Sequence, residues 1–386
     1  FEAVVDTYTR GIANFEGWLR DGVDFRMTIS LTPPLIAMMK ESLLQERTLR
    51  HIDELTKLAE KEYESARKNN SPWEHTVSIH LRELRQSQEI FLRYGKDLTN
   101  AYRYFQDLGF IEIITCGATH GYLPLMSAFP EAVRAQLGIA VNQYKEVFGK
   151  NPRGIWLPEC AYVPGLDAFL KEFGINYFIT DTDALWHANP QPAYGRYLDN
   201  KYASYTPVIT PSGCIAVCRD PETKEAVWSR DSGYPGDSAY LEFHRDLGYD
   251  ADISYIGDYL AHLDRRPVGL KYHRITGKDV PLDKKEYYHP GWAAAKVNEH
   301  AGHFVWARGE QGNYLNGLFW KEKEAYGLGH FSKPLITCAY DAELFGHWWY
   351  EGPAFLDMVM RKFHYDQRAI RPVTISEYLD ENRILQ

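Results

Sequence analysis

The chain has 386 residues and a formal net charge of −9, with its Lys and Arg residues dispersed rather than clustered. That charge argues against nucleic acid or an anionic membrane surface as a partner, because both would repel it. Hydrophobic residues make up 45% and charged residues 25%, which excludes a disordered chain. We find no membrane span, no signal peptide and no metal-binding spacing among the five cysteines, and therefore predict a cytoplasmic protein.

Short apolar runs alternate with helical patterns along the chain. The helical patterns carry apolar residues three or four positions apart, over 49–66 and again after Pro130, and Gly149 and Gly174 suit helix ends. Apolar strands separated by helices are typical of parallel βα units buried on both faces. We therefore predict a parallel α/β barrel. Its expected strands, in chain order, are 25–31, 110–116, 154–157, 177–180, 215–218 and 335–339.

The residues just beyond these strands are the first candidates for a site, because a parallel barrel carries its active site at the carboxyl ends of its strands. Two polar segments rich in Gly, Pro and aromatic residues, 184–205 and 220–240, are long for loops within a domain and predict lids over the barrel mouth. We find no internal repeat and predict one catalytic unit over 1–386. The strand-end residues are 32–34, His120, Glu159, Asp181 and Asp341.

Two carboxylates directly follow predicted strands. Glu159 comes after Pro158, which ends strand pairing, and Asp341 is followed by Glu343, His347 and a Trp pair. An N-cap or a structural ion pair would account for either acid alone. Two such acids beside aromatic rings are what glycosidic cleavage requires: one attacks the anomeric carbon, and the other protonates the departing oxygen. The 27 Tyr, 18 Phe and 10 Trp residues can stack on sugars or fill a core.

His120 lies between Gly117 and Gly121 on the same predicted face of the barrel. A lone histidine is more often a hydrogen-bonded structural residue than a ligand. Because it shares this face with Glu159 and Asp341, we interpret it as functional. We expect the two carboxyl groups to lie about 5–5.5 Å apart, as in retaining enzymes, and the pKa of Asp341 to be raised by ionised Glu159.

Four segments resemble those of the α-glucan branching enzymes of glycoside hydrolase family 57: ATHGYLP, GIWLPECAY, VWSRDSGYPGD and YDAELFGHWWYEGP. The resemblance covers essentially the whole chain and implies an incomplete, TIM-like (β/α)7 barrel. It implies retaining transglycosylation with Glu159 as nucleophile and Asp341 as general acid/base, His120 in the subsite of the attacked sugar, and Trp228 as a cleft wall. We predict no metal and no cofactor. The further predicted substrate-binding residues are Tyr162, His347, Trp348 and Trp349.

Two segments of the family pattern are not found in this sequence. One is a first strand ending in His-x-His-x-Pro, and the other is a C-terminal helical region. A missing first strand would leave the edges of both neighbouring strands unpaired, which is costly for a barrel. We expect either that the segment exists outside this chain or that the chain by itself is inactive.

Several activities remain open at this stage. Branching of 1,4-α-glucans is the leading interpretation, with α-amylase, 4-α-glucanotransferase and a non-catalytic glucan-binding barrel as alternatives. A metal-dependent polysaccharide deacetylase would need a His/His/Asp triad, and no suitably spaced histidine pair follows a strand. An α-glucan is the predicted partner, and no oligomeric state is predicted. Transfer requires that water be excluded. The lid aromatics that could exclude it are Trp186, Tyr194, Tyr197, Tyr202 and Trp228.

Overall fold

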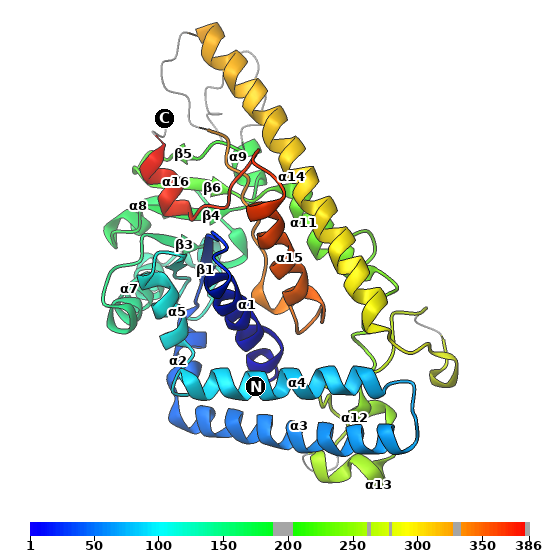
Figure 1. Cartoon of the computed structure of the whole chain (residues 1–386). Helices are drawn as coiled ribbons and strands as arrows, with labels where there is room; N and C mark the ends of the chain where they lie inside the picture. Colours follow the sequence, from blue (N-terminus) through cyan, green and yellow to red (C-terminus); the bar gives the residue numbers. More distant parts are fainter. Residues whose placement is uncertain (188–203, 261–263, 278–279, 327–332, 383–386) are drawn as a thin grey trace.

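The centre of the molecule is a parallel β-sheet, and the computed structural model describes residues 1–187, 204–260, 264–277, 280–326 and 333–382 (Figure 1). Strand β1 (Met27–Ser30) pairs with β2 (Ile111–Ile114), and a parallel bridge between Thr115 and Ile155 links β2 to β3 (Gly154–Trp156). β3 pairs with β4 (Tyr177–Thr180), and β4 with β6 (Ile215–Cys218). The short β5 (Val208–Ile209) runs antiparallel to β6. Among the described residues, five strands therefore form one parallel arc.

Five of the six predicted strands are present, and one prediction was wrong. Residues 335–339 form no strand, although the backbone of this segment accepts one hydrogen bond at Thr337 from Asp220 (2.9 Å) and donates one from Leu335 to Tyr205 (2.9 Å). At the other side of the arc, β1 pairs with β2 alone among the described residues. A largely apolar cavity of about 940 Å³ lies between β1 and 335–339. Because this cavity separates residues 335–339 from β1, the segment has no neighbouring strand, among the described residues, with which to form continuous backbone hydrogen bonds. It is therefore not a strand despite its apolar sequence.

The connections between the first strands are helices, as the pattern predicts. The antiparallel pair α3 (Ser42–Lys68) and α4 (Glu74–Arg93) extends below the sheet in Figure 1. Helix α7 (Pro130–Phe148) starts at the predicted proline and ends at Gly149, whose φ is +74°, and it precedes α8 (Leu166–Glu172). The sheet is tight at Gly154, where a Cβ would lie 2.1 Å from the ring of Tyr177. Glycine is therefore required at this position.

A long connection follows β6 and contains the predicted lid 220–240. The prediction of an irregular segment was wrong for its first part, which is helix α11 (Pro221–Trp228). Asp220 caps this helix by accepting a hydrogen bond from the Thr223 amide (2.7 Å), and Pro221 occupies its first turn. The other predicted lid falls largely on 188–203, which lie outside the described residues.

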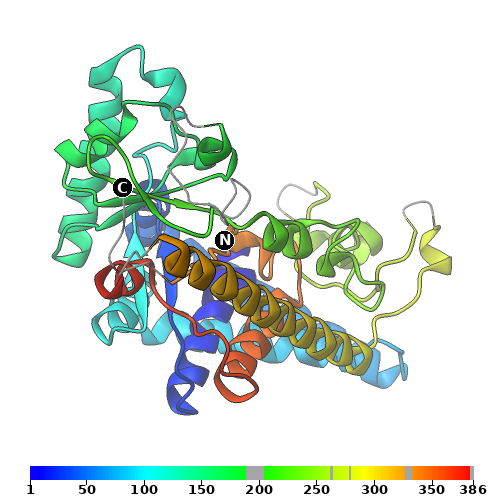
Figure 2. The same ribbon diagram turned by 90° about the horizontal axis from the view of Figure 1, so that it is seen from above.

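The longest helix, α14 (Pro290–Tyr326), packs beside α15 (Gly352–Tyr365). In Figure 2 the teal α7–α8 region and the yellow-green 230–290 region extend on either side of a concave outline, and α14 runs along the outside. One apolar core joins α1, α3, α4, β1 and β2, and a second lies under α14 and α15. No helix among the described residues is long and apolar enough to cross a membrane.

The remaining elements are short. The π-helical turn η1 (Val4–Tyr8) leads into α1 (Thr9–Arg20), which packs against α4 and α15. The others are α2 (Pro33–Lys40), α5 (Thr99–Asp107), α6 (Leu123–Met126), η2 (Pro158–Cys160), α9 (Asp183–Trp186), η3 (Tyr234–Gly236), α12 (Leu247–Asp250), α13 (Ile253–Ile256), η4 (Gly257–Tyr259), η6 (Leu282–Lys284), η7 (Ala342–Leu344) and α16 (Ile375–Glu381).

Candidate active site

Glu159 lies at the carboxyl end of β3, in the 3-10 turn η2. Both Glu159 (φ +56°) and Cys160 (φ +55°) have left-handed backbones, which are strained in residues other than glycine and persist only when the surroundings hold them. The Cys160 carbonyl accepts hydrogen bonds from the Thr180 hydroxyl (2.8 Å) and the Asp181 amide (3.2 Å). The end of β4 therefore holds this turn, and the Glu159 side chain is left 72% exposed.

His120 lies beyond β2 and makes direct contact with Glu159. Its Nε2 is 3.4 Å from Glu159 Oε1, and its Nδ1 is 3.4 Å from Cys116 Sγ. The loop is held from α7, where the Gln136 side chain accepts a hydrogen bond from the Thr119 amide (2.9 Å). The histidine and the carboxylate, which follow different strands, are therefore neighbours.

Asp341 precedes the 3-10 helix η7, but its carboxylate makes no capping hydrogen bond. The N-cap alternative therefore does not describe it. Partial burial raises the pKa of Asp341, and the charges of Glu343 and then Glu159 raise it further, against Arg219 and His120. The predicted direction is confirmed, with Glu343 contributing more than the Glu159 charge on which the prediction rested. Asp341 thus stays protonated to a higher pH than an ordinary aspartate.

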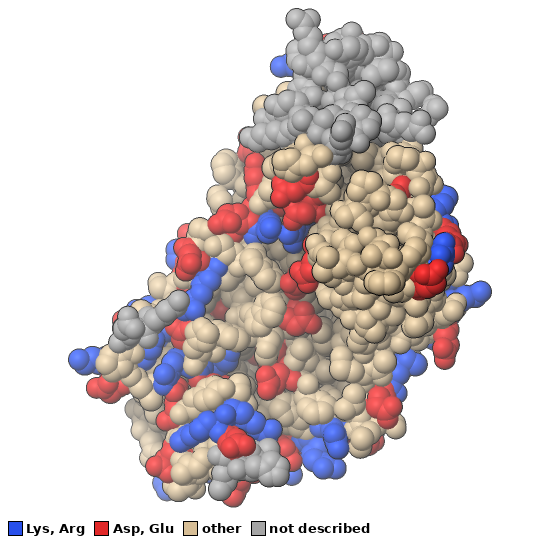
Figure 3. Space-filling view, turned by 180° about the vertical axis from the view of Figure 1, so that it is seen from behind, with Lys and Arg blue, Asp and Glu red and all other residues tan. Residues whose placement is uncertain are grey.

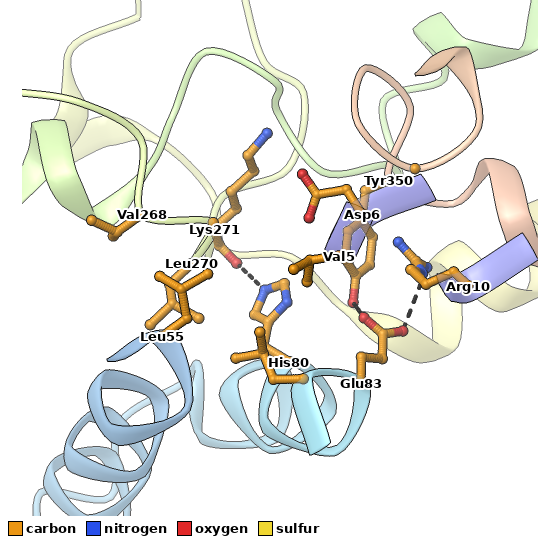
Figure 4. A pocket seen from close by; sticks show the side chains of 13 residues that line it. Val5, Asp6, Arg10, Leu55, His80, Glu83, Val268, Leu270, Lys271 and Tyr350 are labelled. Atoms are coloured by element: carbon orange, nitrogen blue, oxygen red, sulfur yellow. Dashed lines mark hydrogen bonds and ion pairs between the residues drawn. The ribbon is translucent and has the colours of Figure 1, made fainter. Parts of the chain in front are cut away.

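The loop that carries Asp341 is tied to the N-terminal helices. The Tyr8 hydroxyl donates to Glu343 Oε1 (2.5 Å), and His347 Nδ1 lies 3.1 Å from Asp6 Oδ2. Further along, the Tyr350 hydroxyl donates to Glu83 of α4 (2.6 Å). Figure 4 shows Glu83 facing both Tyr350 and Arg10, beside a cavity of about 40 Å³. Helices from the first quarter of the chain therefore position the loop that carries Asp341.

Two tryptophans stand near one another at the ends of separate segments. Trp228 is the last residue of α11 and Trp348 follows η7. Their ring centroids are 5.6 Å apart at 85°, and each residue is 42% exposed. An edge-to-face pair holds both rings in place and leaves ring surface available to a ligand.

The comparisons with known proteins agree on one family. A model described as glycosyl hydrolase family 57 matches residues 6–310. The chain belongs to glycosyl hydrolase family 57. It is 33% identical, over 99% of its length, to a 1,4-alpha-glucan branching enzyme of Thermococcus kodakarensis, and it spans 54% of that relative.

Two solved structures show the same fold. The alpha-amylase AmyC of Thermotoga maritima has a TM-score of 0.89 and 38% identity, and the match covers this whole chain and 70% of AmyC. The crystal structure of the T. kodakarensis family 57 branching enzyme has a TM-score of 0.80 and 32% identity, covering 100% of this chain and 67% of that one. The incomplete barrel predicted from the resemblance is therefore confirmed.

Three of the predicted substrate-binding residues are held by other contacts. Trp349 is 2% exposed and packs against Tyr240 and Phe355, so it has no face for a sugar, and that prediction was wrong. The Tyr162 ring stacks on Phe178 and its hydroxyl donates to Asp167 (3.1 Å). His347 binds Asp6, as described above. The predicted site residues that stay exposed are Glu159, Asp341, His120, Trp228 and Trp348. Of these, His120 contacts Glu159, and the charges of both act on Asp341.

Arg219 is a charged residue of the site that was not predicted. It directly follows β6, and its guanidinium donates to Asp181 Oδ2 (2.8 Å). Burial acts to raise the pKa of Asp181, but the hydrogen bond from Arg219 and its charge hold that pKa below its ordinary value. Because Arg219 directly follows the predicted strand 215–218, its position alone would have marked it as a candidate site residue. The Tyr8–Glu343 contact has no such signal, because 335 residues separate its partners. No cluster of three or more metal-ligating side chains occurs in the described part of the chain.

Proposed function

We propose that this chain catalyses retaining glycosyl transfer on α-1,4-glucans, forming α-1,6 branches. The observation that carries the proposal is the difference between its two carboxyl groups. Glu159 is exposed on a strained turn beside His120, while Asp341 has a raised pKa. Retaining glycosidic cleavage needs one carboxyl group that attacks and one that donates a proton, and its raised pKa suits Asp341 to the second role.

In the first step, the Glu159 carboxylate attacks the anomeric carbon of an α-1,4 bond. Asp341 gives its proton to the departing 4-oxygen, so that a shorter chain leaves and a glycosyl ester on Glu159 remains. In the second step, the Asp341 carboxylate takes the proton of an incoming 6-hydroxyl. The oxygen of that hydroxyl displaces Glu159 and closes the α-1,6 bond. Each proton and bond is then accounted for, and both carboxyl groups return to their starting states.

The neighbouring residues suit these steps. His120 contacts Glu159 and can orient its oxygens, and Arg219 keeps Asp181 ionised near the site. Trp228 and Trp348 offer ring faces to a glucan chain. Seen from behind, acidic side chains border a broad uncharged surface (Figure 3), which suits a neutral polymer better than an anionic one.

Hydrolysis is the second candidate, because the AmyC match has a higher TM-score and identity than the branching-enzyme match. The two reactions share the glycosyl ester and differ only in whether water or a sugar hydroxyl attacks it. Which acceptor wins depends on how well water is excluded from the cleft.

The test is to incubate amylose with the chain and measure α-1,6 bonds and reducing ends separately. New branches with few new reducing ends support branching, reducing ends alone support hydrolysis, and no change supports a binding function. Glu159→Gln should abolish both reactions by several orders of magnitude, because a carboxamide cannot form the ester. Glu172→Gln, an exposed glutamate paired with Arg134, is the matched control. Substantial activity in Glu159→Gln would show that the nucleophile is misassigned.

A further inference from the structure

Three tryptophans form a row on the outer face of α14. Trp292, Trp306 and Trp320 follow one another at intervals of 14 residues and are 59%, 63% and 58% exposed. Fourteen residues of α-helix fall about 40° short of four full turns, so neighbouring rings lie on the same face, about 21 Å apart. The row therefore extends along most of the helix.

The row lies opposite the face through which α14 packs. That inner face buries Ala301, Phe304, Leu315 and Phe319, which contact the core of the protein. Phe304, Arg308 and Gly312 of the inner face line the cavity that also includes His120 and Asp341, so the three tryptophans lie on the side of α14 that faces away from this cavity. The three rings are therefore not explained by the core or by the candidate active site.

The residues around the rings indicate what kind of ligand fits. Among the described residues of α14, every exposed large apolar side chain is aromatic, and no exposed leucine, isoleucine, valine or methionine accompanies them. Exposed Glu299, Glu310 and Asn313 lie on the same side. Protein interfaces are depleted of glutamate in their buried centres, whereas tryptophan is common there. Rings interspersed with charged and amide groups, including His289 stacked on Trp292 and Lys296 paired with Glu299, are thus a poor match for a dry protein contact.

We propose that this tryptophan row is a second α-glucan-binding surface, separate from the catalytic cleft; the proposal rests on the function proposed above. Each indole offers a flat apolar face to the C–H face of a glucose unit, and nearby carboxylate and amide oxygens accept hydrogen bonds from its hydroxyls. A neutral sugar is not repelled by the acidic residues. Rings about 21 Å apart cannot grip one short oligosaccharide but can hold successive parts of a long chain.

Such a surface would act by multivalency. Each ring binds weakly, but contacts made to one polymer reinforce one another, because the second and third contacts form at a high local concentration. The expected consequence is selectivity for long glucans. Glycogen and amylose should bind this face, and a short maltooligosaccharide should not.

The test compares the parent chain with the triple variant Trp292→Ala, Trp306→Ala, Trp320→Ala in native gels containing glycogen. The triple variant should lose at least about tenfold in affinity for glycogen, consistent with lost avidity. Its kcat/KM should fall more on amylose than on a short maltooligosaccharide. The control is Leu43→Ala, Leu92→Ala, which removes exposed apolar side chains from α3 and α4 and should not change retention. A gel containing a soluble cellulose derivative checks that retention is specific to α-glucans.

Equal retention of the triple variant, or no retention of the parent, would overturn the proposal. A parent that is dimeric by light scattering and a triple variant that is monomeric would assign the row to a second copy instead. If the triple variant does not fold, each single variant must still bind glycogen more weakly than the parent. The proposed function is tested by a different result. It fails if the chain produces neither new α-1,6 bonds nor new reducing ends from amylose, whatever the gels show.

Discussion

At the scale of single residues, the two carboxyl groups differ because their backbones and neighbours differ. Glu159 is held outward by a strained turn that β4 stabilises, whereas Asp341 is partly buried and shares its surroundings with Glu343. Glu343 is itself fixed by the Tyr8 hydroxyl. The pKa of Asp341 therefore depends on a third carboxylate, that of Glu343.

Replacing Glu343 with glutamine should move the basic limb of the pH–kcat/KM profile to lower pH. Asp341 must be protonated to act as the acid, so activity falls as pH rises through its pKa. The Glu343 charge raises this pKa, and its removal must therefore lower it. The maximal rate should fall far less than the roughly 10²–10⁴-fold that loss of a general acid costs. Tyr8→Phe keeps the charge and should move the limb much less. A basic limb that stays in place or moves upward would contradict the role of Glu343.

At the scale of elements, α11 is a helix held in place by hydrogen bonds rather than a mobile lid. Its cap residue Asp220 is buried and also receives hydrogen bonds from Tyr205 (2.7 Å) and from Arg308 of α14 (3.2 Å). The Tyr340 hydroxyl, one residue before Asp341, donates to the Thr223 carbonyl (3.2 Å). Trp228 is thereby placed at the end of a helix that is hydrogen-bonded to both α14 and the segment that contains Asp341.

Trp228→Ala should raise hydrolysis relative to branching. The glycosyl ester reacts with any hydroxyl that reaches it, and water is far more abundant than a glucan 6-hydroxyl. Removing the ring admits water, and we expect the ratio of reducing-end release to α-1,6 bond formation to rise by up to about tenfold, or about 1.4 kcal/mol. Leu92→Ala is a control of similar exposure. If both activities fall together with the melting temperature, Trp228 is a structural residue.

At the scale of the whole molecule, segments far apart in the sequence meet at the residues that follow Asp341. Glu83 of α4 accepts hydrogen bonds from Tyr350 (2.6 Å) and Arg10 (3.4 Å), and the Arg10 guanidinium lies over the Tyr350 ring (Figure 4). Glu351 is buried nearby, and burial raises its pKa to about 7. Helix α1, helix α4 and the loop that follows Asp341 are thus joined in one polar network.

Glu83→Gln should destabilise the protein by about 2 kcal/mol, as expected for the loss of hydrogen bonds to a charged group that is largely shielded from water. The amide keeps one acceptor but turns N–H groups toward partners that are themselves donors. Glu60→Gln is the matched control on the neighbouring helix α3, because its pair with Arg85 is exposed on both sides. That control should cost less than about 1 kcal/mol. Urea unfolding midpoints of the three proteins provide the measurement, and equal midpoints would rule the network out as a source of stability.

The sequence by itself determined the family, most strands, the boundaries of α7 and the position of Glu159. These features depend on local signals: apolar periodicity, a proline at a helix start, and an acid directly after a core strand. The start of α11 also carries a local signal, since Asp220 precedes the helix as its cap and Pro221 is its first residue.

Only the tertiary structure decided which aromatic residues are exposed and which charges act on Asp341. Trp348 and Trp349 are adjacent in sequence, yet one is 42% exposed and the other 2%, because the chain turns between η7 and α15. The apolar segment 335–339 is not a strand, since pairing requires a neighbouring edge. Tyr8 meets Glu343 across 335 residues. Burial and long-range contacts arise only when distant segments pack, so no local pattern specifies them.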